Sequence, residues 1–151
     1  MFLAEAVKEK DYLKESITKL CNRVKWLSIT IDVSDAKLNK ELVINKLEEL
    51  DKLYKDYQKY KIIVTRAKAK IVLNLNDDEF SIADAENLVE VLEDKLLFFE
   101  TLITTVEGSN SGPSNMVCVD LKNIDNDVTL LRSDIRAIEQ SIERVLWSTE
   151  I

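Results

Sequence analysis

The sequence predicts an all-α protein: an antiparallel bundle of about four long helices with coiled-coil-like heptad packing. The chain of 151 residues has only two glycines and one proline, far below their usual shares of about 7% and 5%. Turns depend on these residues, so few turns and long elements are expected. All three lie in residues 108–115, GSNSGPSN. Apolar residues elsewhere recur every three or four positions, which is typical of packed helices. We treat residues 1–151 as a single domain.

The first helix is expected at about residues 3–27. One polar residue, Lys10, interrupts its stripe, where it either fixes the helix register or extends its ammonium group to solvent. The stripe consists of Leu3, Ala6, Lys10, Leu13, Ile17, Leu20, Val24 and Leu27. The next residues, SITIDVSD (28–35), are β-branched and polar. They predict a loop in which Ser34 or Asp35 caps the next helix. At most one short strand pair is expected, from residues 28–33 and 116–119.

The second helix is expected at about residues 36–73. Lys61 and Lys68 interrupt its stripe, and β-branched residues and lysines predict a bend or fraying within residues 62–69. The apolar stripe consists of Val43, Leu47, Leu50, Tyr54, Tyr57, Val64 and Ile71. A turn, NLNDDEF (74–80), follows. Its oxygen-rich side chains do not match a calcium-binding EF-hand loop, which needs glycine at its sixth position and glutamate at its twelfth.

The third and fourth helices are expected at about residues 82–107 and 120–147. Ser81 and Asp84 form a capping-box pattern before the third, and Asp120 can cap the fourth. Between them we expect a flexible loop at residues 108–116, because helix interiors exclude glycine and proline. The fourth helix carries an unbroken heptad stripe: Leu121, Ile124, Val128, Leu131, Ile135, Ile138, Ile142 and Val145.

Composition argues against several functions. The net charge of −7 opposes general binding to nucleic acid or to an anionic membrane, and no apolar run approaches the roughly 20 residues that span a bilayer. The absence of histidine removes the commonest general base and most zinc and di-iron sites. Two cysteines, Cys21 and Cys118, form no disulfide framework and suggest a reducing compartment. We therefore expect a cytoplasmic protein that is no enzyme, with no catalytic residue, metal or cofactor.

A basic segment at residues 51–70 carries seven basic and two acidic side chains, with tyrosines between them. The candidate basic patch consists of Lys59, Lys61, Arg66, Lys68 and Lys70. Such a patch can bind single-stranded nucleic acid or a small ligand or nucleotide. Residues 77–100, however, hold nine acidic side chains and one lysine. We therefore favour internal matching of these opposite charges and expect no nucleic-acid partner.

The outer face of the fourth helix is nearly free of charge, although a solvated face should be charged. The candidate oligomer interface on this face consists of Asn126, Leu130, Ser133, Ala137, Gln140 and Trp147. Asn123 and Arg144 lie on the same face. Either the second helix or the loop at 28–35 covers it within the monomer, or a second molecule does. We favour a homo-oligomer, most simply a two-fold dimer.

Both ends of the chain resemble a family of small, uncharacterised bacterial helical proteins, some of which carry the name septicolysin. The resemblance rests on FLAEAVKEKDYLKESITKL (2–20) and on VDLKNIDNDVTLLRSDIRAIEQSIERVLWSTEI (119–151). It implies a helical fold, and the family name implies a membrane-active cytolysin. From the residues we favour a non-enzymatic bundle that associates with itself or with a protein partner through helix faces. The alternatives are a small-ligand or nucleotide binder using residues 51–70 and, more weakly, the cytolysin.

Overall fold

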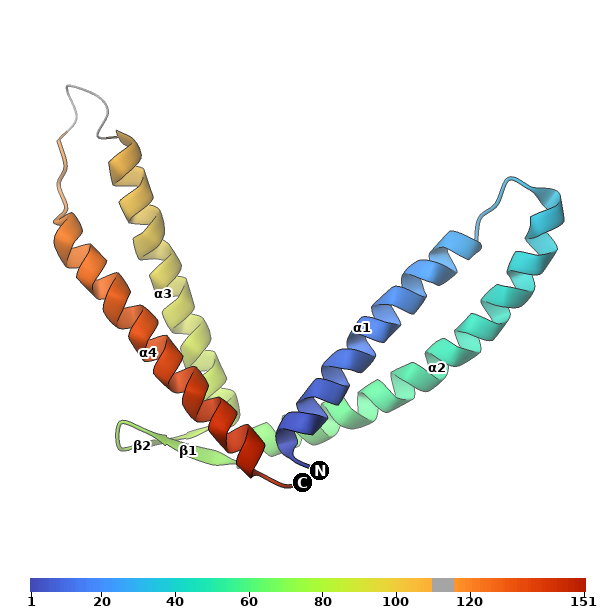
Figure 1. Ribbon diagram of the computed structural model, residues 1–151, viewed down its shortest axis with the longest axis horizontal. Helices are drawn as coiled ribbons and strands as arrows, with labels where there is room; N and C mark the ends of the chain where they lie inside the picture. Colours follow the sequence, from blue (N-terminus) through green and yellow to red (C-terminus); the bar gives the residue numbers. More distant parts are fainter. Residues whose placement is uncertain (110–115) are drawn as a thin grey trace. The chain divides into compact units, whose positions relative to one another are not determined.

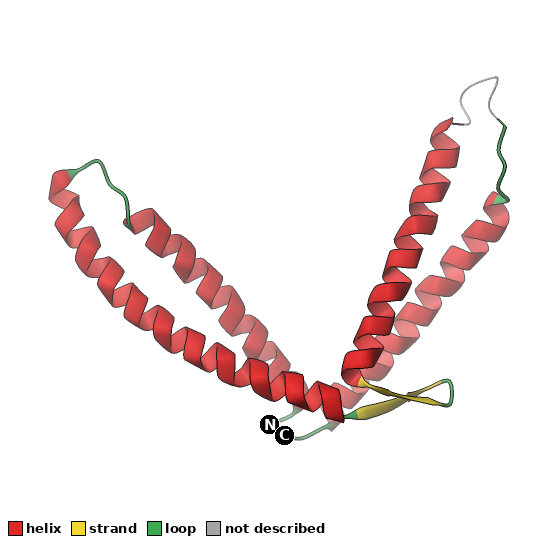
Figure 2. Cartoon of the chain, turned by 180° about the vertical axis from the view of Figure 1, so that it is seen from behind, coloured by secondary structure: helices red, strands yellow, loops and turns green. Residues whose placement is uncertain are grey.

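The computed structural model describes residues 1–109 and 116–151, and its fold is mainly helical, as predicted (Figure 1). Figure 2 colours the same chain by secondary structure. In chain order the elements are α1 (Leu3–Leu27), α2 (Val33–Lys70), β1 (Val72–Leu75), β2 (Asp78–Ser81), α3 (Ile82–Ser109) and α4 (Leu121–Ser148). The chain forms two compact units. One comprises residues 1–67 and 146–151, and the other comprises residues 68–145.

In the first unit, α1 and α2 form a helical hairpin, side by side and antiparallel (Figure 1). The predicted stripe of α1 is its inner face, and four of its members are buried: Leu3, Ala6, Leu13 and Ile17. Lys10 lies on the same stripe, with its side chain 23% exposed and its ammonium 3.1 Å from the exposed carboxylate of Asp11. The lysine stem therefore covers apolar surface while the charge reaches solvent.

Helix α2 is unbroken from Val33 to Lys70, so the fraying expected within residues 62–69 is absent. Its inner face also differs from the predicted stripe. Leu47 and Tyr54 are exposed, whereas Leu53 and Tyr60, one position before Tyr54 and Lys61, are half-buried. Besides Asn39, Ile63 and Lys68, the covered positions are Val43, Lys46, Leu50, Leu53, Tyr57, Tyr60, Val64 and Ala67. These positions also alternate three and four apart, so the sequence contains two heptad frames. The structure covers the frame that includes Leu53 and Tyr60, not the predicted frame that includes Leu47 and Tyr54.

The start of α2 corrects two further predictions. Asp32 caps the helix rather than Ser34 or Asp35: its Oδ1 accepts hydrogen bonds from the Ser34 backbone N–H (2.9 Å) and hydroxyl (2.7 Å). These bonds, the hydroxyl bond first, lower the pKa of Asp32 below its ordinary value. Residues 28–32 and 116–119 form no strands, so the expected strand pair is wrong in its location.

The two ends of the chain pair with each other. The Leu3 N–H donates to the Thr149 carbonyl at 2.8 Å, and the Ile151 N–H donates to the Met1 carbonyl at 3.0 Å. Phe2 and Glu150 form an isolated antiparallel bridge between these two bonds. The Leu3 side chain is completely buried. The pairing therefore fixes the start of α1 and the residues after α4 in the same unit.

A β-hairpin replaces the predicted end of the second helix and the turn after it. Strands β1 and β2 pair antiparallel, with Leu73 opposite Phe80 and Leu75 opposite Asp78. The two residues between the strands, Asn76 and Asp77, have φ angles of 52° and 68°. Positive φ at both positions is the signature of a type I′ turn, whose twist matches that of paired strands. The sequence reasoning missed this hairpin because the turn lacks the usual glycine.

In the second unit, the predicted caps of α3 and α4 are confirmed. Ser81 Oγ accepts from the Asp84 N–H at 3.0 Å, and Asp120 Oδ1 accepts from the Lys122 and Asn123 N–H groups at 3.1 and 3.3 Å. The heptad stripe of α4 is its covered face, with Val128, Leu131, Ile135 and Ile142 buried. Helix α3 continues to Ser109, so the first two residues of the predicted loop at 108–116 are helical. Residues 110–115 of that loop lie outside the described residues.

The hairpin turn yields a stability prediction. Asp77→Gly should raise the free energy of unfolding by about 0.5 kcal/mol, because glycine adopts φ of +68° without strain. Asp77→Val should lower it by about 1–2 kcal/mol, because a β-branched residue is strained there. Urea unfolding followed by circular dichroism measures both. The control is Asp78→Gly, in the strand, which should only destabilise. A stabilising Val or a destabilising Gly at position 77 would contradict the turn type.

The pairing of the two chain ends yields a second stability prediction. Leu3→Ala removes a completely buried side chain and should cost about 2–5 kcal/mol of unfolding free energy. Leu97→Ala is the matched control, because Leu97 is mostly exposed and should change stability by less than about 0.5 kcal/mol. Thermal unfolding compares them, and equal costs would show that the end of α1 is not anchored as described.

Candidate functional site

The predicted interface face of α4 is open in the structure. Leu130 is 62% exposed. Asn126, Ser133, Ala137 and Gln140 are also exposed. These five residues, called the α4 outer strip below, lie opposite the buried stripe and carry no charge. Such a strip presents amide groups, a hydroxyl, small side chains and one large apolar side chain to a neighbour, which suits close helix packing rather than solvation.

Trp147, the sixth residue predicted for this interface, has a partner within the chain. It is 42% exposed, and the Lys8 ammonium lies 4.4 Å from the centroid of its ring. This distance is within the range of a cation–π contact. Trp147 lies in the same unit as α1, so it helps to hold the chain ends together, and we separate it from the α4 outer strip.

The basic segment of α2 is matched by an acidic partner at one position. Lys68 is largely buried and forms an ion pair with Glu86 at the start of α3, which joins the basic and acidic stretches as the charge-matching prediction requires. Both partners lie in the same unit, and Lys68 is only 16% exposed. Because the Glu86 side chain is 40% exposed, the pair is only partly shielded from solvent and from salt.

The other members of the basic patch are exposed. The ammonium of Lys59 lies 5.8 Å from the Tyr60 ring centroid, and that of Lys61 lies 5.6 Å from the Tyr57 ring centroid. Arg66 and Lys70 are exposed, and none of these four cations forms an ion pair within residues 1–109 and 116–151. Among the described residues, one of the five predicted basic residues, Lys68, therefore pairs with a carboxylate.

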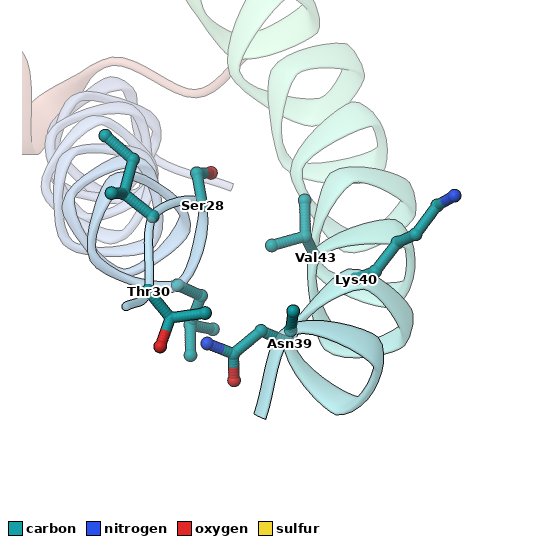
Figure 3. Close-up of a pocket in the computed structure, with 8 residues that line it drawn as sticks. Ser28, Thr30, Asn39, Lys40 and Val43 are labelled. Carbon is teal, nitrogen blue, oxygen red and sulfur yellow. The ribbon is translucent and has the colours of Figure 1, made fainter. Parts of the chain in front are cut away.

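Two features that the sequence reasoning missed lie near the end of α1 and the start of α2. Large apolar side chains are exposed there, most of all Trp26, Ile29, Ile31 and Val33. Beside them is a groove of about 490 Å³ whose lining residues include Ser28, Thr30, Asn39, Lys40 and Val43 (Figure 3). Apolar residues in a polar loop are unusual, so residues 28–35 carry a signal for this surface in the sequence, but from the sequence we predict only a loop with at most a short strand there.

The two cysteines occupy different environments. Cys21 Sγ lies 3.8 Å from the Tyr54 hydroxyl oxygen, and this hydrogen bond raises the pKa of Tyr54 above its ordinary value. Cys118 is exposed, and its thiol donates to the Met116 carbonyl at 3.9 Å. Neither contact pairs a cysteine with a general base.

Two searches of the described residues found nothing. No three histidine, cysteine, aspartate or glutamate side chains in this part of the chain lie close enough together to hold a metal ion. Among the described helices, none combines the length and the apolar character needed to cross a bilayer.

Comparison with known proteins gives no relative. No protein-family model, no curated protein and no solved structure matches this chain. The resemblance of the chain ends to the septicolysin-named family stays a prediction from the residues that carry it. Functional inference therefore depends on the surfaces described above.

Proposed function

We propose that the protein is a non-enzymatic interaction module that associates with itself, most simply as a two-fold dimer, through the α4 outer strip. The observation that carries this proposal is the exposure of an uncharged face on a long helix. A helix face open to water normally carries charge. On α4 the charged side chains other than Arg144 lie on the flanks, whereas the exposed centre carries Leu130, Ser133 and Ala137.

The small residues of the strip favour self-contact. Ser133 and Ala137 are four residues apart, on adjacent turns of the same face. Small side chains let two helix backbones approach closely, and Leu130 supplies apolar area next to them. In a two-fold dimer, the strip would contact the same strip of the second molecule. Each of its residues would therefore have to pack only against other residues of the strip.

The heptad pattern supports an antiparallel four-helix bundle with coiled-coil-like packing as the fold of this module. Each helix has covered positions three and four residues apart, the spacing of such packing. Apolar side chains also remain exposed on other faces, including Leu42 and Leu47 of α2 and Phe98 of α3. Exposed apolar area of this kind commonly marks protein contact sites.

A second candidate function is the binding of a small anionic ligand or nucleotide at the basic patch. Its support is the exposure of Lys59, Lys61, Arg66 and Lys70 without a carboxylate partner in the described part of the chain. A ligand at 100 times its dissociation constant would stabilise the fold by about 2.7 kcal/mol. Thermal-shift measurements with nucleotides therefore distinguish this candidate from self-association.

The self-association proposal predicts the effect of a double substitution. Leu130→Glu with Ala137→Glu places like charges across the dimer contact and leaves the buried stripe unchanged. Light scattering at high micromolar concentration should give about twice the mass of one chain for the wild type and the mass of one chain for the double variant.

A matched control separates contact from added charge. Thr101→Glu with Thr105→Glu adds the same charge at two exposed positions of α3 and should leave the dimer intact. A wild type with the mass of one chain at this concentration, or an oligomer that the α4 double variant preserves, would refute the proposed contact.

A further inference from the structure

A second groove, of about 390 Å³, lies between the β-hairpin and helices α3 and α4, entirely within the unit of residues 68–145. Three elements form its walls. The hairpin contributes Asn74, Leu75, Asn76, Asp78 and Phe80, α3 contributes Leu88 and Leu92, and α4 contributes Asp134, Ala137, Ile138 and Ser141. Its volume is in the range of small-molecule sites, about 300–1,000 Å³.

Half of the lining is apolar. Leu75, Phe80, Leu88, Leu92 and Ile138 are all half-buried rather than buried, so part of each side chain stays open to the groove. Exposed apolar surface in a concave site gains free energy when a ligand covers it, in proportion to the area removed from water. The groove therefore suits a ligand with an apolar body.

The charge of the lining is one-sided. Asp78 and Asp134 contribute two carboxylates, and no lysine or arginine lines the groove. Neither carboxylate forms an ion pair with any residue that the structure describes. The Ser141 hydroxyl donates to the Ala137 carbonyl at 3.0 Å, so its oxygen can still accept a hydrogen bond. Asn74 and Asn76 also line the groove, and an asparagine side chain carries an oxygen that can accept a hydrogen bond.

We propose that this groove is a binding site for a small organic cation, an ammonium or guanidinium group on an apolar body. The apolar part contacts the leucines, Phe80 and Ile138, and the cationic group lies beside Asp78 and Asp134. Because both carboxylates are exposed, their attraction for the cation is that of partly screened surface charges. This site is distinct from the basic patch, which would take an anion. It shares Ala137 with the α4 outer strip, but Leu130 is not part of its lining.

The test uses 4-phenylbutylammonium as the probe and 4-phenylbutanol as its neutral isostere, with the full chain and isothermal titration calorimetry. The ammonium should bind with one site per chain and more tightly than the alcohol. Asp78→Asn and Asp134→Asn should each weaken ammonium binding by about threefold, as expected for partly screened ion pairs. Binding should weaken between 50 and 500 mM salt, because salt screens exposed charges.

Three further variants keep the test specific. Asp127→Asn makes the same charge change at an exposed position of α4 outside the groove and should leave the affinity unchanged. Leu130→Glu should also leave the probe bound, even where it dissociates a dimer. Ala137→Phe should block both the ammonium and the alcohol, because it fills the groove from an exposed position.

Each remaining outcome overturns the proposal. No saturable binding at 10 mM probe, equal affinity for ammonium and alcohol, or equal effects of Asp134→Asn and Asp127→Asn would each contradict a cation site. Both carboxylates are exposed and form no side-chain hydrogen bond or ion pair with described residues, so their variants should keep the wild-type circular dichroism spectrum. The aspartate variants could instead lose binding and also show an altered spectrum. If Ala137→Phe does not also lose binding, Asp78 and Asp134 contribute to folding and not to a cation site.

Discussion

The pairing of the two chain ends is the interaction on which the first unit depends. Two backbone hydrogen bonds and one bridge join residues 1–3 to residues 149–151, and Leu3 is completely buried beside them. Because of this pairing, the last residues of the chain belong to the unit built by α1 and α2, although most of α4 belongs to the other unit. The cation–π contact between Lys8 and Trp147 adds a side-chain link at the same place. Termini usually fray unless something holds them, and here each terminus holds the other.

Helix α4 has two faces with different requirements, and their difference is the basis of the proposed function. One face packs inside the unit, where Val128, Leu131 and Ile135 are buried. The opposite face remains open, and Arg144 is the charged residue that the sequence analysis places on it. Ala137 belongs to the α4 outer strip and also lines the 390 Å³ groove, so the two proposed surfaces are neighbours. The two surfaces share Ala137, whereas Leu130 belongs to the strip alone and Asp78 and Asp134 belong to the groove alone.

The sequence predicts local structure well wherever one pattern has no competitor. The stripe of α4 is unbroken and Asp120 precedes it, so both its covered face and its cap could be predicted. In α2 two heptad frames share Val43, Leu50 and Tyr57, and they differ by one residue at each intervening position. Periodicity alone could not choose between Tyr54 and Leu53, because both are apolar enough for a covered position. The choice depends on the packing partner.

Features that depend on distant residues could not be predicted in this way. The type I′ turn at Asn76 and Asp77 has no glycine, and the apolar alternation before it is only four residues long. The pairing of Phe2 with Glu150 joins residues at opposite ends of the chain, which no local pattern reports. The 390 Å³ groove depends on the hairpin, so it was missed with the hairpin. The α4 outer strip could be predicted because a missing charge is visible in the sequence of one helix.

The most direct test of self-association is a distance measurement between two copies of the strip. Ser133→Cys, with Cys21 and Cys118 replaced by serine, allows one spin label per chain at the centre of the strip. A dimer formed through the strip should give a dipolar coupling between labels at high micromolar concentration, and this coupling should disappear when labelled protein is diluted into unlabelled protein. The coupling should be weaker when the label is moved to Thr101 on α3. No coupling at Ser133, or equal coupling at both positions, would contradict a dimer formed through the α4 outer strip.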